Sequence, residues 1–149
     1  MLIRGILDED FVNFRCPSMY IATAYCDFKC DKENGAHYCQ NSDLVKQPIL
    51  DVKDEVLIQR YLKSFTKAIV FAGLEPFLQF DEIYNFIEKF RQVSQDPVVI
   101  YTGYNEDEIK EETNKLAHFG NIIIKFGRFI PNSSKKFDNI LGVNLASNN

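Results

Sequence analysis

The chain has 149 residues, the length of one ordinary domain, and 46% of them are hydrophobic, which is enough to bury a single core. Its 17 Lys and Arg residues are dispersed and are outnumbered by 21 Asp and Glu, so the composition argues against a nucleic-acid partner. No segment approaches the roughly 18 uninterrupted apolar residues of a membrane span, and the first residues contain acids rather than a signal sequence. We therefore expect one soluble, cytoplasmic domain over residues 1–149, with no membrane partner.

The first expected strand leads directly to a group of cysteines. Residues 18–24 are short, apolar and rich in β-formers, and they end where the cysteines begin. Residues 27–49 are polar, contain Asn34-Gly35 and Pro48, and lack a sustained hydrophobic period. This segment predicts a long loop rather than a helix, and loops of that length inside compact domains usually carry function.

A strand–turn–helix unit follows the loop. Residues 54–62 predict a short helix, and residues 67–72 predict a buried strand that breaks at the turn formed by residues 73–76. After the turn, apolar side chains recur at helical spacing on one face. These side chains are Ile83, Phe86, Ile87, Phe90 and Val93.

The same order of elements repeats in the rest of the chain. Residues 97–101 predict a strand, residues 102–104 a turn, and Asn105 with Glu108 a capping box that opens a helix to about His118. For Asn105, Asp107 and Glu108, a cap and first-turn acids are the preferred interpretation over a binding site. The remaining expected elements are a strand at 121–125, a polar stretch at 132–139 and a last strand at 140–146.

Apolar strands that alternate with amphipathic helices are typical of an α/β fold with a parallel sheet covered by helices. In such sheets, functional groups collect at the carboxyl ends of the strands. The cysteine loop, the two turns after the middle strands and the Phe126-Gly127-Arg128 segment all follow expected strands. We therefore expect these segments to meet at one edge of the sheet.

The cysteines indicate metal or redox chemistry rather than disulfide bonds, which reducing compartments disfavour. Cys26, Cys30 and Cys39 have the spacing C-x3-C-x8-C, and thiolates on one loop can wrap a soft metal centre. A tetrahedral zinc site would need a fourth ligand, for which Cys16 or His37 are candidates, whereas a [4Fe–4S] cluster on three cysteines leaves one iron open. The spacing alone leaves both centres possible.

Taken together, the loops are similar to those of the activating protein of anaerobic ribonucleotide reductase, a member of the radical S-adenosylmethionine (SAM) superfamily. The resemblance covers most of the chain and implies a partial (βα) barrel-like parallel sheet of the small radical SAM type, with helices on its outer face. The matching segments, in chain order, are Cys26-x3-Cys30, Gly73-Leu74-Glu75-Pro76, Ile100-Tyr101-Thr102-Gly103-Tyr104, Gly127-Arg128-Phe129-Ile130 and Ser147-Asn148-Asn149.

The cysteine motif departs from the family pattern, which is C-x3-C-x2-C with an aromatic residue before the third cysteine. The expected third position holds Glu33, and the next thiol is Cys39, six residues later, preceded by Tyr38. The resemblance implies that Cys26, Cys30 and Cys39 hold the cluster and that Tyr38 lies against the adenine of SAM. With Glu33 as a ligand instead, the cluster would be unusual and more labile.

The resemblance also implies residues that bind SAM. The family's G-G-E-P turn has Leu74 in place of its second glycine, and the family's contact with the SAM amino group transfers to Gly73 and Glu75. An exposed carboxylate is a sound partner for an ammonium group, although a plain strand-to-helix turn explains the same residues. Thr102 and Lys125 are candidates for the ribose hydroxyls or the carboxylate of SAM, against the alternative that both are simply solvated.

The activity implied by the resemblance is reductive cleavage of SAM at the cluster to a 5′-deoxyadenosyl radical. That radical would generate a glycyl radical on a large partner enzyme, with electrons from a flavodoxin- or ferredoxin-type donor and no catalytic side chain beyond cluster and SAM. Arg128 could orient the last loop, face the partner or be a surface charge. Two alternatives stay open, namely a radical SAM enzyme for a small molecule or peptide and a non-catalytic zinc-binding module.

Overall fold

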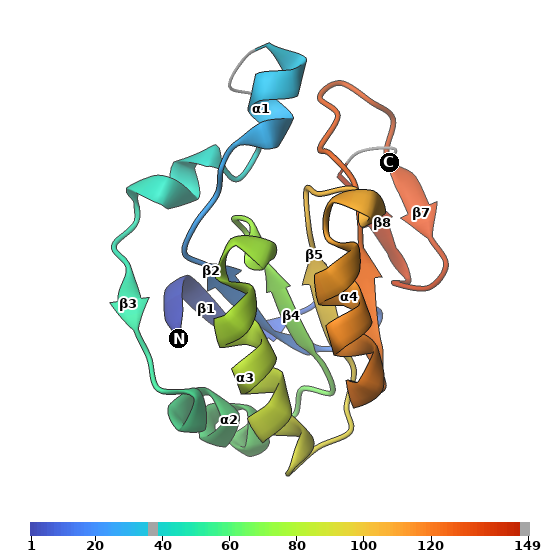
Figure 1. Cartoon of the computed structure of the whole chain (residues 1–149). Helices are drawn as coiled ribbons and strands as arrows, with labels where there is room; N and C mark the ends of the chain where they lie inside the picture. Colours follow the sequence, from blue (N-terminus) through green and yellow to red (C-terminus); the bar gives the residue numbers. More distant parts are fainter. Residues whose placement is uncertain (36–38, 147–149) are drawn as a thin grey trace.

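The computed structural model describes residues 1–35 and 39–146, and its main feature is a six-stranded sheet in the order β3-β1-β2-β4-β5-β6 (Figure 1). Strands β2, β4, β5 and β6 run parallel to one another, whereas β1 pairs antiparallel with both β2 and β3. The six strands are β1 (Leu2–Asp10), β2 (Ser18–Thr23), β3 (Leu50–Asp51), β4 (Ile69–Ala72), β5 (Val98–Tyr101) and β6 (Ile122–Lys125).

Helices cover one face of this sheet, and a small hairpin lies beside it (Figure 1). The helices are α1 (Lys29–Asn34), α2 (Asp54–Lys63), α3 (Phe80–Arg91) and α4 (Lys110–Leu116), with 3-10 turns η1 (Ser42–Lys46), η2 (Pro76–Gln79), η3 (Glu106–Glu108) and η4 (Ala117–Phe119). The hairpin pairs β7 (Lys136–Asp138) antiparallel with β8 (Val143–Leu145). In Figure 1, α2, α3 and α4 lie against the sheet, while α1 stands beyond the end toward which β4 and β5 point.

The strands expected from apolar runs are confirmed as β2, β4, β5 and β6, and the expected helices are confirmed as α2, α3 and α4. The apolar face of α3 buries Ile83, Phe86, Ile87 and Phe90, whereas Val93 lies beyond the helix end and is exposed. The predicted capping box is present at Asn105 and Glu108, and the expected helix is divided there into η3, α4 and η4.

Several elements differ from the expectation. Strands β1 and β3 were not anticipated, the segment expected to be one long loop contains α1 and η1, and the polar stretch contains β7. Helix α1 has six residues, begins after Phe28 with φ 57°, and has no side-chain cap, so nothing in its local sequence indicates a helix. Contacts with other elements therefore hold it.

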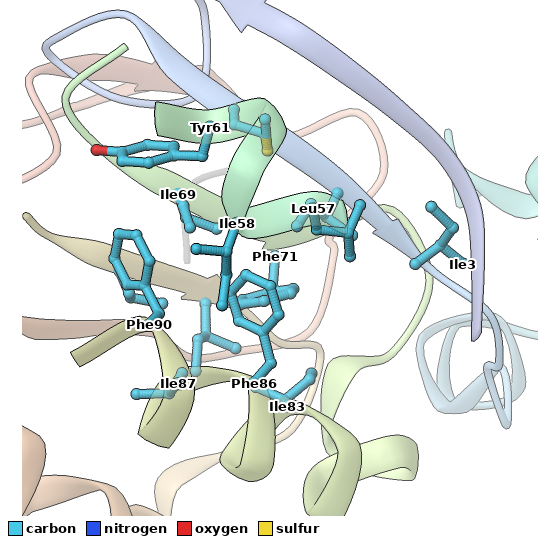
Figure 2. Packing of buried hydrophobic residues seen from close by; sticks show 14 of the residues in the cluster. Ile3, Leu57, Ile58, Tyr61, Ile69, Phe71, Ile83, Phe86, Ile87 and Phe90 are labelled. Carbon is cyan, nitrogen blue, oxygen red and sulfur yellow. The ribbon is translucent and has the colours of Figure 1, made fainter. Parts of the chain in front are cut away.

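The core has two layers because the strand side chains alternate between the faces of the sheet. From β4, Ile69 and Phe71 point toward the helices and Val70 and Ala72 toward the opposite face. On the helix side, Phe71 meets Phe86 edge to face at 5.4 Å between ring centroids (Figure 2). The second layer is smaller and consists of Phe14, Ala68, Val70, Ala72, Val99, Leu141 and Leu145.

In the described part of the chain, no helix is both long and apolar enough to cross a membrane.

Candidate metal and cofactor site

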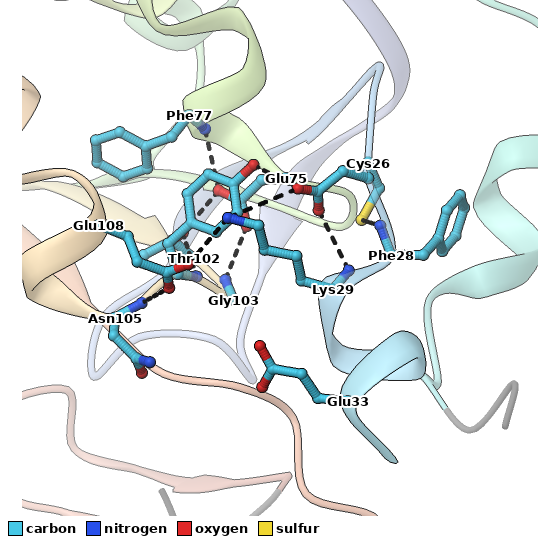
Figure 3. A network of polar contacts seen from close by, with 12 residues as sticks. Cys26, Phe28, Lys29, Glu33, Glu75, Phe77, Thr102, Gly103, Asn105 and Glu108 are labelled. Atoms are coloured by element: carbon cyan, nitrogen blue, oxygen red, sulfur yellow. Dashed lines mark hydrogen bonds and ion pairs between the residues drawn. The ribbon is translucent and has the colours of Figure 1, made fainter. Parts of the chain in front are cut away.

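The carboxyl ends of the parallel strands bring the expected site segments together. Cys26 follows β2, residues 73–75 follow β4, residues 102–104 follow β5, and residues 126–129 follow β6. Contacts among these segments, described below, confirm that they share one edge of the sheet (Figure 3). The parallel pairing places these loops side by side, as the order of elements predicted.

Glu75 is the best-defined group at this edge. Its carboxylate accepts hydrogen bonds from the Thr102 hydroxyl at 2.6 Å, the Gly103 N–H at 2.8 Å and the Phe77 N–H at 3.1 Å (Figure 3). The expectation of an exposed carboxylate is wrong, because Glu75 is only 4% exposed. Burial raises the pKa of Glu75 in spite of these hydrogen bonds, which favour the charged form.

Thr102 is not a solvated threonine, since its hydroxyl donates to Glu75 and also accepts the Tyr104 N–H at 3.0 Å. Its buried hydroxyl fixes one oxygen of the carboxylate. In this structure Thr102 therefore positions Glu75.

The Cys30 thiol lies against the same loops, and the Cys26 thiol is held within its own loop. A Cβ atom built on Gly103 would lie 3.0 Å from the Cys30 Sγ and 3.4 Å from the Glu75 Oε2, so the thiol and the carboxylate share one wall. The Cys26 Sγ accepts the Phe28 N–H at 3.3 Å. Burial, together with the nearby charges of Glu75 and Asp27, raises the pKa of Cys26 to about 11.

The main chain of Cys39 is tied to α1, the helix that carries Cys30, in spite of its distance in sequence. Its N–H donates to the Asp31 Oδ1 at 2.9 Å, and the Ser42 hydroxyl donates to the Asp31 Oδ2 at 3.3 Å. Asp31 is a buried residue of α1, directly after Cys30. These two hydrogen bonds tie the residues around Cys39 to the helix that carries Cys30.

The donor set suits an iron–sulfur cluster, because three thiols are the usual protein ligands of such clusters. Within residues 1–35 and 39–146, no three Cys, His, Asp or Glu side chains stand close enough to hold a metal ion between them. The described residues thus show no preformed single-ion site, and the fit to a [4Fe–4S] cluster rests on the chemistry of the three thiols.

Of the two candidates for a fourth zinc ligand, Cys16 does not join the thiols. Cys16 precedes β2 and Cys26 follows it, so they lie at opposite ends of that strand, and Cys16 packs partly against the second core layer. Partial burial raises the pKa of the Cys16 thiol. His37 lies outside the described residues.

Arg128 connects α1, the helix that carries Cys30 and is called the cysteine helix below, to the loop after β5. Its guanidinium pairs with Glu33 at 2.9 Å and with Glu108 at 2.8 Å, and it also donates to the Gly103 carbonyl. The side chain is 11% exposed, so the interpretation as a surface charge is wrong. The Glu33 carboxylate pairs with Arg128, so in this structure it is not placed as a cluster ligand. The contacts with Arg128 and Lys29 hold the pKa of Glu108 at about 2.

The remaining expected SAM ligands are placed in different ways. Gly73 has φ 88°, and a Cβ there would lie 3.0 Å from both the Tyr20 hydroxyl and the Leu44 Cδ1, so the position requires glycine. Lys125 is on β6, where its ammonium donates to the Phe126 carbonyl and contacts neither Glu75 nor a described thiol. Tyr38, expected beside the adenine, lies outside the described residues, as do residues 147–149.

Comparison with known proteins agrees with the chemistry of the thiols. Residues 14–148 match the model of the family described as the 4Fe-4S single cluster domain. Comparison with curated proteins and with solved structures gave no significant match. The matched range contains all four cysteines and all the loops at the carboxyl ends of the parallel strands. Since the match spans nearly the whole chain, this protein belongs to the 4Fe-4S single cluster domain family.

Proposed function

We propose that this protein is a radical SAM activating protein, which binds one [4Fe–4S] cluster on Cys26, Cys30 and Cys39 and binds SAM beside Glu75. Its product would be a glycyl radical on a partner enzyme, as for the activating protein of anaerobic ribonucleotide reductase. The observation that carries the proposal is the shared wall at Gly103, where the Cys30 thiol and the Glu75 carboxylate both lie.

Glu75 has the properties of a ligand for an organic cation. It is buried, its orientation is fixed by three hydrogen bonds, and no salt bridge is formed to it within the described residues. A buried carboxylate without a cationic partner is costly, and an incoming ammonium group would offset that cost. The amino group of SAM is such a cation and would lie within reach of the cluster.

The chemistry assigned to each group follows from its position. When bound and reduced, a cluster of this type supplies the electron that cleaves SAM into methionine and a 5′-deoxyadenosyl radical. The three cysteines would bind three of the cluster's four irons, and Glu75 would orient the amino group of SAM. Gly103 has no side chain, so it would leave room for the Cys30 thiol and the Glu75 carboxylate beside it. The four parallel strands with helices on one face support a partial (βα) barrel-like arrangement of the radical SAM type.

The partners are part of the proposal. Among residues 1–35 and 39–146, little beyond α1 and the hairpin β7–β8 lies past the sheet edge to enclose a substrate (Figure 1). A large glycyl radical enzyme would complete the site, and a flavodoxin- or ferredoxin-type donor would reduce the cluster.

Anaerobic reconstitution with iron and sulfide tests the cluster and the cleavage together. We expect about four irons per chain and release of methionine and 5′-deoxyadenosine from SAM under a strong reductant. Cys30→Ala should lose the cluster, whereas Cys16→Ala, a thiol at the other end of β2, should keep it. Stoichiometric zinc without SAM cleavage would instead identify a non-catalytic metal-binding module.

Glu75→Gln tests the SAM contact separately, because it removes the charge and keeps the size of the side chain. Truncating one partner of a buried charge pair costs about 2 kcal/mol or more, so we expect SAM affinity to fall by about thirtyfold or more with full iron content. Equilibrium binding of SAM to the reconstituted protein measures this. Glu111→Gln, an exposed acid on α4, is the matched control, and equal affinities of the two variants would reject the assigned role of Glu75.

A further inference from the structure

The segment after β6 lies directly against the cysteine helix. The main-chain N–H of Phe129 donates to the Cys30 Sγ at 3.3 Å, across 99 positions of the sequence. The Phe129 carbonyl accepts a hydrogen bond from the Asn34 Nδ2 at 3.2 Å. The Asn34 Nδ2 also donates to the Cys30 carbonyl at 2.7 Å. The Phe129 main chain is thus tied to α1 through both its donor and its acceptor.

We propose that Arg128 is a positioning residue for the cluster, which directs the Phe129 N–H to the Cys30 sulfur and thereby raises the reduction potential of the bound cluster. The inference needs only the cluster and its ligand Cys30, and it does not depend on SAM cleavage.

The contacts of Arg128 explain how it can hold the segment. Its ion pairs reach Glu33 on α1 and Glu108 on η3, and its third contact is the Gly103 carbonyl after β5. The preceding residue, Gly127, donates its N–H to the Tyr104 carbonyl at 2.9 Å and has φ 111°, where a side chain would be strained. Three elements therefore fix the main chain on the amino side of Phe129.

A hydrogen bond to a coordinated sulfur withdraws electron density from it. This favours the reduced cluster, which carries one more negative charge, and so it raises the potential. The bond from Phe28 to Cys26 acts in the same way but joins residues two apart, so it comes with the local turn. The Phe129 bond depends on the tertiary structure and can be altered without changing the cysteine loop.

The positive charge of Arg128 would itself raise the potential, so the test must separate charge from position. Arg128→Lys keeps the charge but lacks the planar fork that reaches three partners at once. We expect a more negative midpoint potential in Arg128→Lys, and a larger shift in Arg128→Gln, in redox titrations followed by electron paramagnetic resonance. Arg60→Gln removes an arginine that pairs with Asp8 on the surface, and its potential should match the wild type.

The outcomes are distinct for the two proposals. A wild-type protein that fails to bind about four irons would defeat both proposals, whereas a cluster that forms without cleaving SAM would defeat only the proposed function. A wild-type potential in Arg128→Lys, with the iron retained, would defeat only the positioning role. If the variants lose the cluster, the positioning role is tested instead by the exchange rate of the Phe129 amide hydrogen in the metal-free protein. At least tenfold faster exchange in Arg128→Lys than in Arg60→Gln supports the role, and equal rates overturn it.

Discussion

Gly103 is the residue at which the two halves of the site meet. A Cβ at this position would come within 3.0 Å of the Cys30 Sγ, a separation that real Cβ atoms rarely show. Its φ is not in the left-handed region, so the requirement for glycine comes from close approach and not from backbone strain. The sequence contains this glycine within a matching motif, but only the tertiary contact explains why it must lack a side chain.

We predict that Gly103→Ala displaces the Cys30 thiol and lowers the iron content after reconstitution, while the fold persists. Iron and sulfide analysis measures the first effect and circular dichroism the second. Gly5→Ala is the control, because a Cβ there would meet its nearest neighbour, the Ala22 Cβ, at an ordinary 4.0 Å. Full iron content in Gly103→Ala would show that the wall at this position can move away from the sulfur.

At the level of elements, the sequence predicted those whose signal is local. Strand β4 is a continuous apolar run and α3 has a strongly periodic apolar face, so neither depends on distant residues to be recognised. Helix α1 is short and uncapped, and the reach of Asp31 from it to Cys39 cannot be read from spacing. The same limit applies to Glu75, whose burial arises from donors on the next strand's loop.

The α1–η1 segment explains how Cys39 can be held near α1 although eight residues separate it from Cys30. The chain leaves α1 through Gly35 at φ 75°, and the Cys39 N–H then returns to the Asp31 carboxylate. The one hydroxyl hydrogen of Ser42, at the start of η1, is shared between the Cys39 carbonyl at 2.8 Å and the Asp31 Oδ2 at 3.3 Å. Asp31 thus links the helix that carries Cys30 to the residues around Cys39.

We predict that Asp31→Ala releases Cys39 from α1, because the variant loses the acceptor of both the Cys39 N–H and the Ser42 hydroxyl. The reconstituted variant should hold less iron and lose its cluster faster on dilution or mild chelation, followed by the cluster's visible absorbance. Asp43→Ala, in the same loop, removes an exposed acid whose partner is Lys46 and should behave as the wild type. Wild-type cluster lifetime in Asp31→Ala would mean that Cys39 reaches the cluster without this anchor.

For the molecule as a whole, the core and the site occupy separate regions. The main core lies between the sheet and α2 and α3 (Figure 2), and the second layer lies on the opposite face of the sheet. None of the three proposed ligands belongs to either layer. The cysteine helix projects past the sheet edge, so its loss should leave most of the buried apolar surface intact.

This separation predicts that stability and metal binding can be changed independently. Phe86 is fully buried and contacts the rings of Phe71 and Phe90, so Phe86→Ala should lower the free energy of unfolding by about 3–5 kcal/mol. Cys30→Ala lies outside both core layers and should change that free energy in the metal-free protein by only about 0.5 kcal/mol while abolishing cluster binding. Urea unfolding of the metal-free variants measures both values. Comparable losses would show that the cysteine helix unfolds together with the sheet, because a cooperative unit shares the cost of any defect within it.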